Sequence, residues 1–175
     1  RTHSYTAVLF VDIDRFKQVN DSHGHLVGDQ LLRSVAQRLS MLIRPSDTLC
    51  RLSGDEFVFL YEDLAGVDDV FGLVRRIDDT FEKPFRLDRV SVTVRASVGV
   101  AFVGPGEAVT PDLLMRADLD MYRKKRTGTT GAHVKPPNSG LSRTIEGRLR
   151  IARGTCTVEG GVLRRDSRAI RCWPR

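Results

Sequence analysis

Three carboxylates stand at two points of the sequence where the chain is expected to turn. Asp12 follows the apolar run 6–11, whose β-branched residues predict a buried strand that ends at this acid. Asp55 and Glu56 lie between two further strand-like runs, which predict a hairpin with an acidic tip. Carboxylates that converge on one edge of a sheet suit Mg²⁺, and two such ions can orient a phosphoryl transfer. Asp and Gly are also ordinary turn formers, so solvated turn residues are the alternative interpretation.

The spacing of apolar residues predicts the elements that would position these acids. Their order, βαββαβα with short connections, indicates an α+β fold: a mostly antiparallel sheet of the ferredoxin-like type, flanked by helices on one face. Gly99 is a candidate bulge or close-approach site in the last strand region. The predicted elements are strand 6–11, a helix from Gly28 to the Arg44-Pro45 step, strands 49–52 and 57–61, helix 67–81, a strand pair or one bent strand over 90–103, and a helix that starts at Thr110-Pro111.

The composition indicates one globular domain with a short extension. The chain has 175 residues, 41% of them hydrophobic and 29% charged, and no apolar run approaches the roughly 20 residues of a membrane span. Its start, Arg1-Thr2-His3-Ser4, suggests a piece of a longer protein. We expect a domain over 1–134, a linker over 135–140, and a basic tail over 141–175. A helix could start at 142–151, and no fold is assigned to the rest of the tail.

The net charge of +6 belongs to the tail. Residues 141–175 hold nine Arg against three acids, whereas the charges of residues 1–140 balance. No part of the folded region interleaves basic and aromatic residues as a nucleic-acid surface would, so nucleic acid is not the expected partner. Three cysteines without C-x-x-C spacing argue against a disulfide framework or a thiolate zinc site and fit a reducing cytoplasm.

Three segments, in order, resemble the signature motifs of one known family. Residues 10–29, FVDIDRFKQVNDSHGHLVGD, look like its "DIDxFKxxND…GHxxGD" segment. Residues 51–57, RLSGDEF, look like its "RxGGDEF" hairpin with Ser53 in place of the first Gly. Residues 117–125, ADLDMYRKK, are similar to its "AD…YxAK" helix. The chain thus resembles the GGDEF family of diguanylate cyclases over about Tyr5 to Val134, and the resemblance implies a nucleotidyl-cyclase-like fold.

The resemblance implies that two GTP molecules, one in each half of a homodimer, condense to cyclic di-GMP with release of two pyrophosphates. The metal would be Mg²⁺ or Mn²⁺, with two ions per active site. Asp12 and Asp55 would be side-chain ligands and Ile13 a backbone carbonyl ligand. Glu56 would either coordinate the second metal or help to deprotonate the attacking 3′-hydroxyl. Gly54 fits a turn with positive φ that lets phosphate lie against the backbone.

The same resemblance implies contacts with the nucleotide. Phe16 and Lys17 would supply backbone amides and a cation to the β- and γ-phosphates. Asn20 and Asp29 would read the guanine edge, since an amide offers a donor and an acceptor while a carboxylate accepts from the guanine N1 and N2 hydrogens. Lys125 would approach the terminal phosphate, although dipole complementarity alone also explains cations at a helix C-terminus.

Arg44 and Asp47 form an RxxD pattern just before the hairpin, where many family members carry an inhibitory site for product. An Arg fork can bind phosphate or the guanine Hoogsteen edge, and an Asp can accept from guanine. A helix-terminal Arg followed by a turn Asp is the alternative explanation.

Two departures from the family pattern leave a second function open. Ser53 replaces a glycine, and Thr129-Thr130 stand where the family often has Arg-Asn. The alternative to an active cyclase is therefore a silent module that binds GTP or cyclic di-GMP and regulates a neighbouring domain. We also expect a sensory or EAL domain in the full-length protein, and a cytoplasmic location, either free or as part of a membrane-anchored protein.

Overall fold

The computed structural model describes residues 4–127, 147–151, 154–159 and 162–166. Its main sheet has seven strands in the order β6-β1-β3-β2-β7-β8-β9, and every neighbouring pair is antiparallel. The first four of these strands carry the site. They are β1 (Tyr5–Ile13), β2 (Thr48–Ser53), β3 (Glu56–Leu64) and β6 (Ala96–Val103).

The described residues contain four helices. α1 (Phe16–His23) and α2 (His25–Ser40) lie between β1 and β2, α3 (Val67–Glu82) follows β3, and α4 (Pro111–Thr127) follows β6. A separate two-stranded sheet, β4 (Phe85–Arg86) with β5 (Ser91–Val92), follows α3. Among the described residues, no helix is both long and apolar enough to cross a bilayer.

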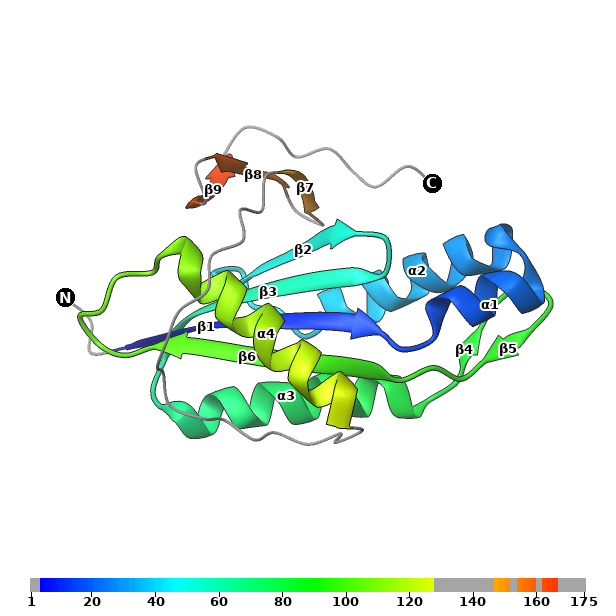
Figure 1. Ribbon diagram of the computed structural model, residues 1–175, viewed down its shortest axis with the longest axis horizontal. Coiled ribbons are helices and arrows are strands. Elements are labelled where there is room, and N and C mark those ends of the chain that lie inside the picture. The colour runs from blue at the N-terminus through cyan, green and yellow to red at the C-terminus, as the bar shows by residue number, and fades with distance from the viewer. Residues whose placement is uncertain (1–3, 128–146, 152–153, 160–161, 167–175) are drawn as a thin grey trace.

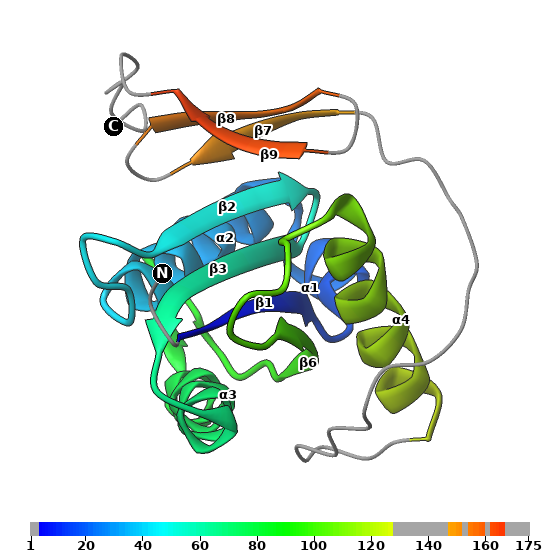
Figure 2. The same cartoon turned by 90° about the vertical axis from the view of Figure 1, so that its left-hand side faces the viewer.

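The helices pack on both faces of the sheet, so the expectation that they lie on one face is wrong. Alternate residues of β1 explain the arrangement. Leu9 and Val11 belong to the core that α2 and α3 share, whereas Val8 and Phe10 belong to a smaller core that includes α4. Figure 1 shows α4 crossing the sheet in front, and Figure 2 separates it from α3 on the other side. The prediction of an antiparallel sheet flanked by helices is confirmed.

Several predicted elements need correction. The predicted helix at Gly28 begins at His25 and ends at Ser40, before the Arg44-Pro45 step. Helix α1 was not predicted, because Val19 is its only buried residue and an eight-residue helix gives little periodicity. Within 90–103 the strands β5 and β6 do not pair with each other, since β5 pairs with β4.

The end of the chain also departs from the expectation. The predicted helix over 142–151 is wrong where the structure describes this segment, because Gly147–Ile151 is strand β7. β7 pairs with β2 and continues into β8 (Gly154–Glu159) and β9 (Val162–Asp166). The expected domain end at 134 and linker over 135–140 lie outside the described residues.

Gly99 is a close-approach site, as its position in the strand suggested. A Cβ atom added there would lie 2.0 Å from the Ala117 carbonyl oxygen and 2.3 Å from the Met121 nitrogen. The backbone of α4 therefore rests directly on β6. This contact sets how closely α4 packs on the sheet, and it brings the last turn of α4 toward the end of β1.

Candidate active site

The topology brings the predicted acids to one edge of the sheet. Asp12 lies opposite Glu56 in the antiparallel register of β1 and β3. The Ile13 amide donates to the Asp55 carbonyl oxygen at 3.2 Å. The end of β1 and the β2–β3 turn thus form one unit, in which Asp12, Ile13, Asp55 and Glu56 are neighbours.

The β2–β3 turn accommodates serine at the position where the family hairpin has glycine. Gly54 has a φ of 44°, whereas Ser53 is not among the residues with positive φ in the described chain. The left-handed conformation that favours glycine is therefore confined to Gly54. The Ser53 hydroxyl donates to Glu56 Oε2 at 2.6 Å, and Arg51 Nε donates to the Gly54 carbonyl at 2.7 Å. Ser53 consequently holds the Glu56 carboxylate and leaves the turn intact.

Asp12 is the buried acid of the site, with 9% of its surface exposed. Lys125, in the last turn of α4, places Nζ 2.5 Å from Asp12 Oδ1. Burial raises the pKa of Asp12, and the Lys125 ammonium offsets that effect only in part. For Lys125, burial lowers the pKa, but the hydrogen bond to Asp12 and the charges of Asp12, Asp14 and Asp55 together outweigh burial, so the pKa is raised. The single positive charge of Lys125 therefore does not fully compensate for the burial of the Asp12 carboxylate.

The donor set suits a hard divalent cation in its chemistry. Three carboxylates and a backbone carbonyl at one edge are oxygen ligands of the kind that Mg²⁺ and Mn²⁺ take. In the part of the chain that the structure describes, however, no three His, Cys, Asp or Glu side chains are gathered closely enough to hold an ion. Asp12 instead faces Lys125 and Glu56 faces Ser53. The residues fit a metal, but two of the acids have protein partners in this geometry.

Helices α1 and α2 carry the residues predicted to contact the nucleotide. Phe16 and Lys17 lie in the first turn of α1, and Asn20 lies one turn later. A Cβ atom at Gly28 of α2 would lie 1.9 Å from Asn20 Oδ1 and 3.3 Å from Phe16 Cζ. Gly28 thus provides the space in which the Asn20 amide sits against α2. Asp29, the next residue of α2, is exposed.

Arg51 is a residue of the site for which no role was predicted from the sequence. It lies on β2 before the turn, where the charges of Asp29 and Asp55 both act on its guanidinium. Burial lowers the pKa of Arg51, while these two carboxylates raise it by less. Arg51 therefore links the acid predicted to read guanine with an acid predicted to hold metal. Its place in the family hairpin motif was the only signal in the sequence.

The Arg44–Asp47 segment has a different geometry. Asp47 is 6% exposed, and its Oδ2 accepts a hydrogen bond from the Arg44 amide at 2.7 Å. The Asp47 amide donates in return to the Arg44 carbonyl at 3.0 Å. The Arg44 side chain is exposed. Nearby, the hydroxyl of the buried Tyr61 has no hydrogen-bond partner among the residues that the structure describes. Burial, and to a smaller extent the charge of Asp47, raises the pKa of Tyr61.

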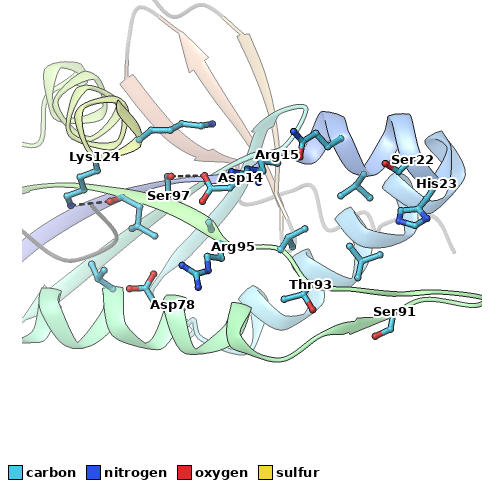
Figure 3. Close-up of a pocket in the computed structure, with 18 residues that line it drawn as sticks. Asp14, Arg15, Ser22, His23, Asp78, Ser91, Thr93, Arg95, Ser97 and Lys124 are labelled. Carbon is cyan, nitrogen blue, oxygen red and sulfur yellow. Dashed lines mark hydrogen bonds between the residues drawn. The ribbon is translucent and has the colours of Figure 1, made fainter. Parts of the chain in front are cut away.

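A cavity of about 880 Å³ lies beside this site, between α1, β6, α3 and the end of α4 (Figure 3). The turn from β1 into α1 forms part of its wall. There Asp14 accepts a hydrogen bond from the Ser97 hydroxyl at 2.7 Å, and Arg15 adopts a φ of 58°. Lys125 lines the cavity, but Asn20, Asp29, Asp55 and Glu56 do not. Apart from Lys125, the predicted nucleotide contacts therefore lie outside this cavity.

Comparison with known proteins gives a consistent result. A family model described as "Diguanylate cyclase, GGDEF domain" matches residues 1–131. The chain is 41% identical over 126 residues to the bifunctional diguanylate cyclase/cyclic di-GMP phosphodiesterase MucR of Pseudomonas aeruginosa, covering 71% of this chain and 18% of MucR. It is 37% identical over 126 residues to the cyclic di-GMP phosphodiesterase NbdA of the same organism, covering 72% of this chain and 16% of NbdA.

A solved structure supports the same grouping. The crystal structure of the GGDEF domain of YfiN, also called TpbB, from Pseudomonas aeruginosa superimposes with a TM-score of 0.67 at 40% identity. The match covers 71% of this chain and 78% of that one. The chain thus spans most of a solved domain and less than a fifth of the larger relatives MucR and NbdA.

Proposed function

Because this chain belongs to the GGDEF family of diguanylate cyclase domains, we propose that it condenses two GTP molecules to cyclic di-GMP and two pyrophosphates. The observation that carries the proposal is the convergence of Asp12, Asp55 and Glu56 at one sheet edge, with Lys125 bonded to Asp12. Phosphoryl transfer needs positioning and charge neutralisation more than covalent help from the protein. This edge supplies oxygen ligands and a cation for both tasks.

Each proposed role is the one that the family resemblance implies for the residue. Asp12, Asp55 and the Ile13 carbonyl hold Mg²⁺ or Mn²⁺, two ions per active site, and Glu56 either holds the second ion or accepts the proton of the 3′-hydroxyl. When bound, the metal supplies charge neutralisation on the phosphates.

The remaining roles concern the nucleotide. Lys17 and the Phe16 amide bind the β- and γ-phosphates, and Lys125 approaches the terminal phosphate. Gly54 lets phosphate approach the backbone of the turn. Asn20 and Asp29 select guanine, because adenine would leave their hydrogen-bonding groups unmatched.

The proposed reaction requires a second protomer, since each active site binds one GTP and the two nucleotides attack each other. We further propose that Arg44 and Asp47 bind the product and inhibit the enzyme. In the cell, the domain would act in the cytoplasm within a longer signalling protein that carries a sensory or EAL domain. MucR, of which this chain covers 18%, is named as both a diguanylate cyclase and a cyclic di-GMP phosphodiesterase.

The second candidate function is a silent GGDEF module that binds GTP or cyclic di-GMP and regulates its neighbour. Two observations favour it: NbdA is named only as a phosphodiesterase although it shares this domain sequence, and Glu56 is bonded to Ser53. Thr129 and Thr130, which replace the expected cation, lie outside the described residues.

One assay separates the two functions. The chain is incubated at high protomer concentration with GTP and Mg²⁺, and nucleotides are identified by liquid chromatography with mass spectrometry. An active cyclase yields cyclic di-GMP, with an activity per protomer that rises with protein concentration. Retained GTP binding without any product at any concentration would support the silent module and contradict the proposed activity.

A further inference from the structure

The last three turns of α4 are held to the free edge of β6 by side chains spaced four residues apart. The outer edge of a sheet exposes backbone groups that need partners. Here the side chains of α4, and not a further strand, bond the outer backbone groups of β6. The contacts are Arg116 Nη2 to the Phe102 carbonyl at 3.5 Å, the Val100 amide to Asp120 Oδ2 at 2.9 Å, and Lys124 Nζ to the Val98 carbonyl at 3.1 Å.

This arrangement makes α4 a rigid support. Asp120 and Lys124 also pair with each other at 2.8 Å, and the bond from Lys124 to Val98 is visible in Figure 3. With Gly99 packed against the helix backbone, α4 cannot slide along β6 without breaking several contacts at once. Lys124 stands where the family motif has alanine, so this bond belongs to this chain's own sequence. Any movement of the Lys125 ammonium must therefore come from its own side chain.

Lys125 follows the anchored Lys124 and reaches Asp12 instead. The two partners of this ion pair differ in exposure: the side chain of Asp12 is 12% exposed and that of Lys125 is 43% exposed. Asp12 is fixed within β1, whereas the long lysine side chain has solvent beside it. The pair can open by rotation of Lys125 alone, with Asp12 and α4 in place.

We propose that Lys125 is a displaceable counter-ion: it neutralises Asp12 in the metal-free site and leaves it when a divalent cation and a nucleotide bind. This inference rests on the proposed function, because it takes Asp12 as a metal ligand. An ammonium on Asp12 Oδ1 and a divalent ion bound to the same carboxylate would be like charges in close proximity, so the two repel each other and compete for Asp12. Lys125 therefore competes with the metal until a phosphate offers the ammonium another partner.

The competition couples the two ligands. Without nucleotide, metal binding must break the ion pair, so the affinity for metal is low. With nucleotide, Lys125 pairs with phosphate and Asp12 becomes available, so the affinity rises. By linkage, metal must raise the affinity for nucleotide by the same factor. The lysine thus delays metal binding until the substrate is present.

The test measures Mn²⁺ binding by electron paramagnetic resonance in the wild type, K125M and K125R, with and without a non-hydrolysable GTP analogue. Without nucleotide, K125M is expected to bind Mn²⁺ about fivefold tighter than the wild type, the scale of one partly buried ion pair. The analogue should then increase Mn²⁺ affinity less in K125M than in the wild type. K125R, which keeps the charge, should retain the weak binding.

Arg126→Met is the matched control, because it removes one positive charge from the neighbouring position, where Arg126 is exposed and lies over the Tyr122 ring. If K125M binds Mn²⁺ no tighter than R126M, the inference is wrong, and the proposed function still stands if the wild type forms cyclic di-GMP. If no variant binds Mn²⁺ with or without nucleotide and no product forms, the proposed function fails and the inference fails with it.

Discussion

The acids at the end of β1 and the acid of the Arg44–Asp47 segment both belong to family motifs, but the fold uses them differently. At the end of β1, Asp12 is paired with Lys125 and Glu56 is bonded to Ser53, and both partners are side chains that can rotate away. Asp47 is bonded to a backbone amide in its own turn. A side-chain partner can be exchanged for a ligand, whereas a backbone partner is part of the fold.

This difference separates function from stability in the two regions. Substitution of the acids at the end of β1 and in the β2–β3 turn should remove activity with little loss of stability, because these side chains contribute mainly to ligand binding. Substitution of Asp47 should cost stability whether or not the segment also binds product. The following predictions test that separation.

The largest expected effect is the loss of turnover when an acid of the β2–β3 turn is substituted. Asp55→Asn or Glu56→Gln should lower cyclic di-GMP formation by about 10³-fold, the scale on which phosphoryl transfer loses rate without a charge-neutralising group. Both side chains are only partly buried, so the free energy of unfolding should change by less than about 0.5 kcal/mol. Product formation and urea denaturation measure the two quantities. A variant that loses activity because it unfolds would contradict the separation.

Asp12→Asn should also abolish turnover but should stabilise the metal-free domain. The pKa of Asp12 is raised in the folded state, so its ionised form is less favourable there than in the unfolded chain. Its contribution to stability is present below pH about 4 and is lost as pH rises through the folded-state pKa. At pH 7 without metal, the midpoint of thermal unfolding of D12N should therefore exceed that of the wild type by about 2 °C.

The control for this prediction is acidic pH, at which Asp12 is protonated in both states. The difference in unfolding midpoint should shrink toward zero as pH falls through the ordinary range of a carboxyl group. A D12N variant less stable than the wild type at pH 7 would show that the pairing with Lys125 outweighs the burial of the charge.

Asp47→Ala should cost about 1–3 kcal/mol of stability, because it leaves a backbone amide without its buried acceptor. Arg44→Ala is the matched variant: its side chain is exposed, so stability should be nearly unchanged. If the segment is an inhibitory site, cyclic di-GMP should no longer inhibit R44A. Urea denaturation and inhibition by added product measure the two effects. Unchanged inhibition of R44A would leave Asp47 with its structural role alone.

The smallest effect is expected at Ser53. Ser53→Gly restores the glycine of the family hairpin and removes the hydrogen bond to Glu56. Because an exposed hydrogen bond contributes only about 0.5 kcal/mol, the rate should change by no more than about threefold. A steady-state assay beside the wild type measures it. A far larger gain in rate would mean that Ser53 holds Glu56 in an inactive position.

The sequence predicted those features that depend on local pattern. The run before Asp12, the hairpin around Gly54 and the helix start at Thr110-Pro111 all have strong periodic or turn signals, and the structure has each of them. The convergence of Asp12 with Asp55 and Glu56 followed from the order of elements. Helix α1 and the strands after residue 146 lacked such signals.

The sequence could not predict features that depend on packing. Gly99 was a candidate close-approach site, but nothing in the sequence indicated that the backbone of α4 is what rests on it. The pairing of Lys125 with Asp12 joins residues far apart in the chain and depends on how α4 is anchored. The inward orientation of Asp47 arises from a turn that an RxxD pattern does not specify.

The central claim is that the carboxylates of Asp12, Asp55 and Glu56, at the end of β1 and in the β2–β3 turn, catalyse the condensation of GTP. Phosphorus-31 nuclear magnetic resonance of GTP and Mg²⁺ with the wild type and with E56Q, at equal and high protomer concentrations, tests it most directly. The account predicts two pyrophosphates for each cyclic di-GMP with the wild type and almost none of either with E56Q. Absence of both signals in the wild type, or equal signals in the two proteins, would contradict it.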